Sequence, residues 1–83
     1  MNITIRYTGK INASHLLEAQ RPMSNVIIVT MTASLYAGDM CYYVSFHASS
    51  ERVHQSFMQK LKAGGSEFEY EGFECNQHVY KAL

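Results

Sequence analysis

The stretch MCYYVSFHASSERVHQSFMQKL, residues 40–61, predicts a strand that runs directly into a helix. Its first eight residues alternate with the period of a half-buried strand, and the side chains on the inward face are Met40, Tyr42, Val44 and Phe46. Ser49 or Ser50 can then cap a helix by accepting bonds from free backbone N–H groups. The apolar side chains that follow are spaced as on the buried face of a helix: Val53, Phe57 and Leu61, with Met58 beside them.

The residues before this stretch predict two further strands and a short helix. Residues 2–8 alternate as a half-buried strand does, and residues 12–20 predict a short helix that Pro22 ends. Residues 25–36 are rich in β-branched side chains and predict a second strand. A turn at residues 37–39 joins this strand to the next, so the two strands form a hairpin.

The residues after the second helix complete the expected fold. Residues 67–71 alternate strictly and predict a strand, Gly72 breaks the alternation with a bulge or a turn, and residues 76–83 predict either a further short strand or a final helical turn. The order β-α-β-β-α-β specifies an α+β, ferredoxin-like fold. We expect one antiparallel sheet with two helices on one face, in a single domain spanning residues 1–83.

The composition provides no overall charge that would attract a polyanion. Seven basic and seven acidic residues give a formal net charge of zero, so binding to nucleic acid or to a membrane surface would need a local patch. The N-terminus lacks the pattern of a signal peptide, and no apolar run is as long as a membrane span. We therefore expect a cytoplasmic protein in which Cys41 and Cys75 are reduced thiols.

Residues 43–46, YVSF, match the last four positions of the third-strand signature of the RNA recognition motif. The chain resembles that family in this segment, in the helix that follows it and in the order of its elements. The resemblance implies that Tyr43 lies on the helix-free face of the sheet, where such domains stack bases. The sequence departs from the family at Cys41 and Thr4, which occupy positions that are aromatic in the family, so one stacking residue remains.

The expected helix-free face supports an RNA-binding hypothesis. Its middle strands would present Arg6, Tyr43 and His47, which can contact phosphates and bases. The second helix adds a local concentration of positive charge from Arg52, Lys60 and Lys62. Two plainer interpretations remain open, because an outward Tyr43 can be a dimer contact and the basic helix residues can be a solvated face.

The two edges of the expected sheet support protein-binding hypotheses. Glu67, Glu69 and Glu71 alternate along one edge, where they could engage a basic protein or simply discourage sheet-to-sheet aggregation. Val26 and Ile28 would form an exposed apolar patch near the other edge. The simplest cover for that patch is a second copy of the chain, so we expect a homodimer.

The residues suited to metal binding or catalysis do not form a recognisable set. Cys75 and His78 have a tolerable spacing for zinc, but Cys41 and His47 would lie about 20 Å apart on one strand. The sequence contains no CxxC pair, and we predict no metal and no cofactor. It also contains no recognisable catalytic nucleophile with an adjacent base and no phosphate-binding glycine loop, so we do not expect an enzyme.

These observations favour a small non-catalytic binding protein. Short chains without linker, cofactor motif or catalytic set resemble accessory proteins of phages or mobile elements. The first hypothesis is a phage-type regulator or inhibitor that stoichiometrically blocks a host nucleic-acid-handling partner, such as a nuclease, toxin or ribonucleoprotein, with RNA contact as a further element. The alternative is a ferredoxin-like dimeric domain, either small-molecule-sensing or subunit-like, that does not bind nucleic acid, and a purely structural dimer ranks third.

Overall fold

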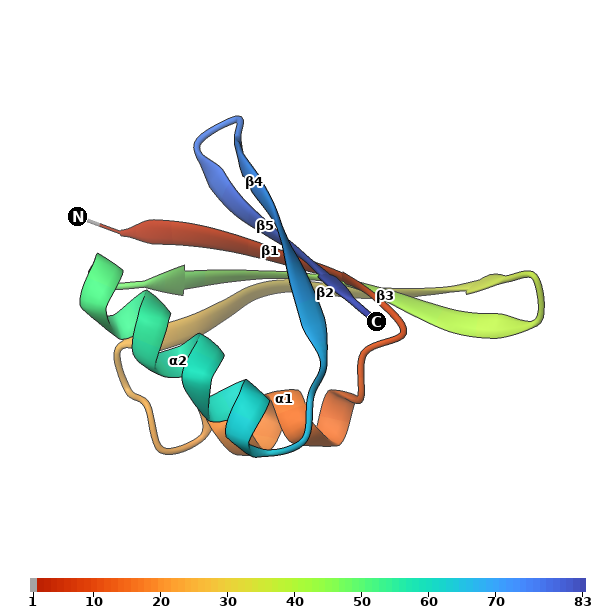
Figure 1. Ribbon diagram of the computed structural model, residues 1–83, viewed down its shortest axis with the longest axis horizontal. Coiled ribbons are helices and arrows are strands. Elements are labelled where there is room, and N and C mark those ends of the chain that lie inside the picture. Colours follow the sequence, from red (N-terminus) through yellow and green to blue (C-terminus); the bar gives the residue numbers. More distant parts are fainter. Residues whose placement is uncertain (1) are drawn as a thin grey trace.

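The computed structural model describes residues 2–83, apart from the side chain of Tyr36. Two helices lie against one face of a five-stranded sheet, as Figure 1 shows. The elements in chain order are β1 (Ile3–Gly9), α1 (Ala13–Gln20), β2 (Val26–Tyr36), β3 (Asp39–Ala48), α2 (Glu51–Ala63), β4 (Phe68–Glu74) and β5 (Gln77–Ala82). The predicted α+β class is confirmed, and both helices lie on one side of the sheet as expected.

The sheet differs from the prediction by one strand. Its order is β2-β3-β1-β5-β4. β5 runs parallel to β1 while the other neighbouring pairs are antiparallel, so the expectation of a wholly antiparallel sheet is wrong. β5 lies in the C-terminal tail, for which the sequence predicted either a short strand or a helical turn. It lies between β1 and β4, so it displaces β4 from the place beside β1 that a four-stranded ferredoxin-like order gives to it.

A tight hairpin returns β5 into the sheet. Its two loop residues, Cys75 and Asn76, have positive φ angles of 52° and 61°, which is the geometry of two-residue turns that match the twist of the flanking strands. The register of β4 against β5 shifts between Tyr70 and Gly72. A bulge therefore occurs where the sequence predicted a bulge or a turn, and it restores the side-chain alternation of β4.

The hydrophobic core lies between the sheet and the two helices. Its most deeply buried apolar side chains are Ile5, Tyr7, Leu16, Val26, Val44, Phe46, Phe57 and Leu61. The rings of Phe46 on β3 and Phe57 on α2 pack with their centroids 4.9 Å apart. Ser50 caps α2, because its side chain accepts a hydrogen bond from the Val53 N–H. The inward positions predicted from the opening stretch are thus confirmed at Val44, Phe46, Phe57 and Leu61.

A bulge in β2 reverses the faces that the sequence assigned to the start of this strand. Val26 and Ile28 pair with core residues of β3, and the register shifts between Ile28 and Thr30. Val26 is buried, and Ile28 packs partly buried against the core. The prediction that these two residues form an exposed apolar patch is therefore wrong. Val29 is the extra residue of the bulge, and beyond it odd-numbered side chains instead of even-numbered ones face the core. The alternation of side chains in the sequence does not reveal this change of face.

The end of the β2–β3 hairpin projects beyond the rest of the sheet (Figure 1). β1 pairs with β3 only from Tyr42 onward, so residues 34–41, which we call the arm, have no third strand beside them. Leu35 and Met40 pair across the arm and are 70% and 46% exposed. An ion pair of 2.8 Å between Lys10 and Asp39 ties the arm to the end of β1. The arm therefore presents apolar side chains to solvent in a defined position.

Candidate functional site

β2 forms one edge of the sheet and is free of charge along its whole length. Its 11 residues, VIIVTMTASLY, include no charged side chain, no proline and no glycine. β3 occupies one side of the strand, so the backbone N–H and C=O groups on the other side face outward. Several apolar side chains along it are exposed by between 39% and 70%: Ile27, Val29, Met31 and Leu35. Long uncharged edge strands are templates for pairing with a further strand.

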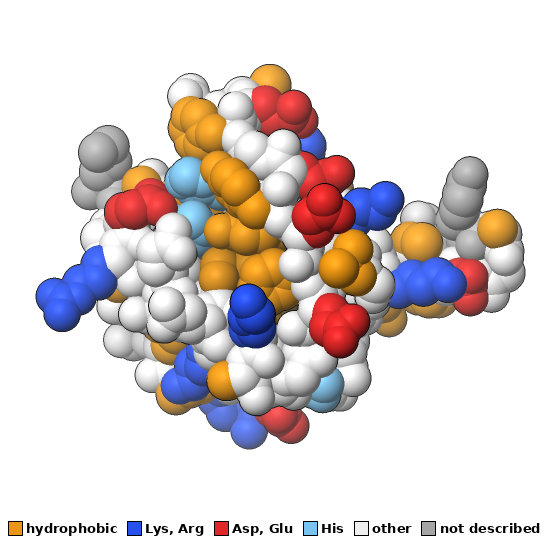
Figure 2. Space-filling view, viewed as in Figure 1, with side chains coloured by type: hydrophobic (Ala, Val, Ile, Leu, Met, Phe, Trp, Pro, Cys, Tyr) orange, Lys and Arg blue, Asp and Glu red, His pale blue; other side chains and the backbone are white. Residues whose placement is uncertain are grey.

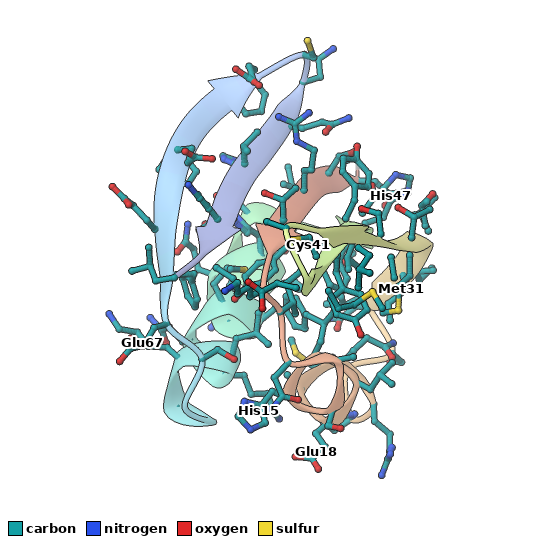
Figure 3. The ribbon with its side chains drawn as sticks, turned by 90° about the vertical axis from the view of Figure 1, so that its right-hand side faces the viewer. His15, Glu18, Met31, Cys41, His47 and Glu67 are labelled. Carbon is teal, nitrogen blue, oxygen red and sulfur yellow. The ribbon has the colours of Figure 1, made fainter. Side chains whose placement is uncertain are left out.

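The exposed apolar side chains of β2 lie on both faces of the hairpin. Ile27 is opposite His47, on the helix-free face, whereas Met31 is opposite the core residue Val44. Figure 3 shows Met31 and His47 on opposite sides of the hairpin. The bulge at Val29 causes this change of face. A strand added beside β2 would consequently meet apolar side chains both above and below the sheet.

β4 forms the other edge of the sheet and has the opposite character. Exposed glutamates gather there, as the red side chains over β4 in Figure 2 show: Glu67, Glu69, Glu71 and Glu74. Glu69 is opposite Lys81 in the register, and Glu74 accepts a hydrogen bond from Arg6 at 2.8 Å. The structure therefore places the three glutamates named from the sequence at or beside an edge strand, as predicted.

Arg6, Tyr43 and His47 all lie on the helix-free face, but Arg6 already has partners. Its guanidinium carbon lies 6.0 Å from the centre of the Tyr43 ring, within cation–π range. The same guanidinium forms an ion pair of 2.8 Å with Glu74. The carboxylate neutralises this charge and would repel an incoming phosphate, while the Tyr43 ring is 38% exposed. RNA contact on this face stays a prediction.

The basic residues of α2 are separated from the helix-free face. Arg52, Lys60 and Lys62 are exposed on the helix, and α2 covers one face of the sheet (Figure 1). Tyr43 belongs to the other face, because it alternates along β3 with Val44, which is buried under the helices. The two parts of the predicted RNA site are therefore not brought together. A single strand of RNA would have to pass around an edge of the sheet to touch both.

A cluster of five polar side chains joins the start of α2 to β4 and β5. We call it the histidine cluster, and its members are Glu51, His54, Tyr70, His78 and Tyr80. The Glu51 carboxylate lies 2.8 Å from His54 Nδ1 and 3.3 Å from His78 Nε2. The remaining ring nitrogens lie 2.8 Å from the hydroxyls of Tyr80 and Tyr70 respectively. The two imidazole rings stack with centroids 4.4 Å apart.

The bonds of His54 determine which of its ring nitrogens carries a proton. An ionised carboxylate only accepts hydrogen bonds, so His54 Nδ1–H donates to Glu51 at 2.8 Å, whereas His78 Nε2 makes only a longer contact of 3.3 Å with the other carboxylate oxygen. Nε2 of the neutral His54 ring then accepts from the Tyr80 hydroxyl, and His78 Nδ1 shares a hydrogen bond of 2.8 Å with the Tyr70 hydroxyl. Both nitrogens of the buried His54 ring thus have a hydrogen-bond partner.

Burial sets the protonation states of the inner half of the cluster. His54 is only 1% exposed. Loss of solvation lowers the pKa of His54 below its ordinary value, although the Glu51 carboxylate opposes this change. Burial likewise raises the pKa of Tyr80 to about 12, with a further contribution from the charge of Glu51. The hydrogen bond from His54 lowers the pKa of Glu51. At neutral pH the inner half of the cluster therefore holds the Glu51 carboxylate, a neutral His54 imidazole and a neutral Tyr80 hydroxyl.

Three members of the cluster have the chemistry of metal ligands. One ligand atom from each of Glu51, His54 and His78 can be chosen so that all three lie within 4.8 Å of one another. An open pocket of about 320 Å³ lies beside them, lined by His54, Gln55, Tyr70, His78 and Tyr80. In Figure 2, histidine side chains reach the surface next to an apolar hollow. Cys75, which the sequence paired with His78, is exposed at the β4–β5 turn and does not belong to this group.

The sequence contained one local signal for this cluster, which our sequence analysis missed. Glu51 and His54 are three residues apart at the start of a predicted helix, and such a Glu-x-x-His pair projects both side chains to one side. His78 is 24 residues beyond His54 and lies in the tail whose structure the sequence left ambiguous. Only the pairing of β5 with β1 brings its ring against α2.

Comparisons with known proteins do not extend these observations. A scan against protein-family models, a search of curated proteins and a search of solved structures each found no match. Neither helix within residues 2–83 has the length and apolar character needed to cross a membrane.

Proposed function

We propose that this protein is a non-catalytic binding protein that forms a homodimer through β2 and blocks a basic, nucleic-acid-handling partner through β4. The observation that supports the proposal is the contrast between the two edges of one sheet. β2 has no charged residue over 11 positions, whereas four exposed glutamates lie on or beside β4. Charged side chains on an edge strand prevent further strand pairing, and their absence permits it.

A second copy of the chain is a suitable occupant for the β2 edge. In a two-fold dimer, β2 would pair antiparallel with β2 of the other copy. Equivalent side chains then approach one another near the axis, and like charges there would destabilise the pairing. The uncharged sequence of β2 avoids that repulsion. Exposed side chains such as Ile27 and Leu35 would gain cover from the partner.

The same arrangement leaves the acidic edges available. β2 and β4 are at opposite ends of the strand order, so pairing through β2 leaves β4 at the outer ends of the dimer. A row of carboxylates attracts proteins whose surfaces are basic, and surfaces that handle nucleic acid are basic for the same electrostatic reason. Occupation of such a surface by a carboxylate edge excludes nucleic acid, which would make the protein a stoichiometric inhibitor.

The mass of the protein in solution tests the dimer. We expect light scattering to give twice the 9.4 kDa mass of one chain. Replacement of Thr30→Lys and Thr32→Lys places charges on exposed positions of β2 and should give a monomer with an unchanged circular dichroism spectrum. Ser56→Lys on the exposed face of α2 adds the same type of charge away from β2 and should stay dimeric. A wild-type monomer at 100 µM, or a dimeric β2 variant, would contradict the proposal.

Charge reversal on β4 tests the inhibitory edge separately. Glu69→Lys with Glu71→Lys should abolish salt-sensitive retention of nucleic-acid-handling proteins from host lysate, while Ser56→Lys should retain them. The variant should remain a dimer, because β4 is distant from β2 in the strand order. If the β4 variant and the wild type retain the same proteins, the acidic edge is not the binding surface.

A further inference from the structure

We propose that Glu51, His54 and His78 form a zinc-binding site. Two imidazoles and one carboxylate make up a ligand set that Zn²⁺ accepts, and sites with three protein ligands keep a fourth position open for water or another ligand. α2 supplies Glu51 and His54 in its first turn, and β5 supplies His78. The site lies within one chain, so it does not depend on the proposed dimer or on its partner.

The distances between the ligand atoms are close to those that the ion needs. Bonds of 2.0–2.1 Å in a tetrahedral arrangement separate neighbouring ligand atoms by about 3.4 Å. The two histidine nitrogens that face Glu51 lie 2.8 and 3.3 Å from its carboxylate oxygens. Because the longest separation in the triad is within 4.8 Å, small side-chain rotations suffice to close the site around an ion.

The tyrosine hydroxyls of the cluster are suitably placed to support the ligands. A histidine that binds a metal through one nitrogen usually donates the N–H of its other nitrogen to an oxygen. Tyr80 offers such an oxygen to His54 Nε2, and Tyr70 offers one to His78 Nδ1, both at 2.8 Å. On zinc binding, the proton of the His54 ring would move from Nδ1, which faces Glu51, to Nε2, which faces Tyr80. The ion then replaces the N–H···O bond from His54 to Glu51, and the number of protons on the His54 ring does not change.

His78 is the ligand that must adjust. The two rings are stacked with an angle of 23° between their planes, whereas an ion bound in the plane of both rings requires them to tilt toward it. His54 is 1% exposed, whereas the side chain of His78 is 18% exposed on β5, so His78 is the less buried of the two rings. The adjoining pocket would give the fourth coordination position access to water.

Calorimetric titration with zinc chloride tests the site on untagged protein stripped with EDTA. We expect one zinc ion per chain. A rise in the melting temperature of about 10 °C or more should occur when free zinc is 100 times its dissociation constant. Cobalt(II) should bind competitively and give visible absorption bands of a four- or five-coordinate site. The same titration on Cys75→Ser should be unchanged, because the exposed thiol is not a ligand in this site.

Matched variants separate a metal site from a purely hydrogen-bonded cluster. Glu51→Gln and His78→Gln should each weaken zinc binding by about 100-fold or more, and Tyr70→Phe by about 10-fold. His47→Gln removes a histidine on the other face of the sheet and should leave the affinity unchanged. Tyr70→Phe keeps the experiment decisive if a ligand variant fails to fold. Absence of saturable zinc binding at 100 µM, or equal affinity in Tyr70→Phe, Glu51→Gln and the wild type, would overturn the proposal.

Discussion

Removal of one hydroxyl, in Tyr80→Phe, should destabilise the protein far more than the same change at Tyr70. Each hydroxyl shares a hydrogen bond of 2.8 Å with a histidine nitrogen, so the two hydrogen bonds have the same length and join the same pair of chemical groups. They differ in burial, because Tyr80 and its partner His54 are 6% and 1% exposed whereas Tyr70 is 49% exposed. The pair therefore isolates the effect of burial on a Tyr-to-His hydrogen bond.

The size of the stability loss in Tyr80→Phe follows from the His54 ring nitrogen that loses its hydrogen-bond donor. In Tyr80→Phe the Nε2 atom of His54 loses its donor on a side chain that is only 1% exposed, and an unsatisfied buried acceptor costs about 1–3 kcal/mol. The total stability expected for a chain of this size is only about 4–12 kcal/mol. For a domain of this length, that loss corresponds to a fall in melting temperature of about 4–20 °C. In Tyr70→Phe, solvent can replace the hydroxyl, and we expect a loss below about 0.5 kcal/mol.

Urea unfolding followed by circular dichroism measures the difference, with EDTA present to keep metal ions out of the cluster. The midpoint should fall clearly for Tyr80→Phe and little for Tyr70→Phe, with the same slope for all three proteins. A zinc-free comparison is necessary because a bound ion would stabilise the folded state independently. Equal losses in the two variants, or a larger loss in Tyr70→Phe, would refute the argument from burial.

Two further predictions concern protonation and RNA. Burial lowers the pKa of His54 in the folded protein below 6.5, its ordinary value. Below pH 6.5 the unfolded chain therefore binds more protons than the folded protein. The contribution of His54 to the free energy of unfolding should be full above pH 6.5 and should fall as the pH approaches the pKa of the folded state. Glu51 from α2 and His78 from β5 face this ring, and the lowered pKa of Glu51 adds a further loss at more acidic pH. Urea midpoints between pH 8 and 5 measure this, and a constant midpoint would contradict it. RNA binding predicts that nucleic acid absorbing at 260 nm co-purifies with the wild type and that this binding weakens steeply with salt. The double variant Tyr43→Ala with Lys60→Ala should lose this nucleic acid. Wild-type preparations that are free of nucleic acid would exclude RNA binding.

The sequence predicted those parts of the fold whose signals are local. The alternation of Val44 with Phe46 and the spacing of Phe57 and Leu61 are properties of neighbouring residues, and each of these side chains is buried. The prediction failed at Val26 and Ile28, because a bulge inserts one residue and shifts every later side chain of β2 to the other face. It also left the tail undecided, although Cys75 and Asn76 make the tight turn that returns it.

By itself, the sequence determined the α+β class, the succession of a strand and a helix within residues 40–61, and the acidic character of the β4 segment. Those features depend on the periodicity of apolar side chains and on the charges of a few consecutive residues, and both can be read directly from the sequence. Only the tertiary structure decided that β5 lies beside β1, that the uncharged β2 is an edge, and that His78 stacks on His54. These relations depend on which distant segments pack together, and the free energy of that packing belongs to the whole molecule and not to any short stretch.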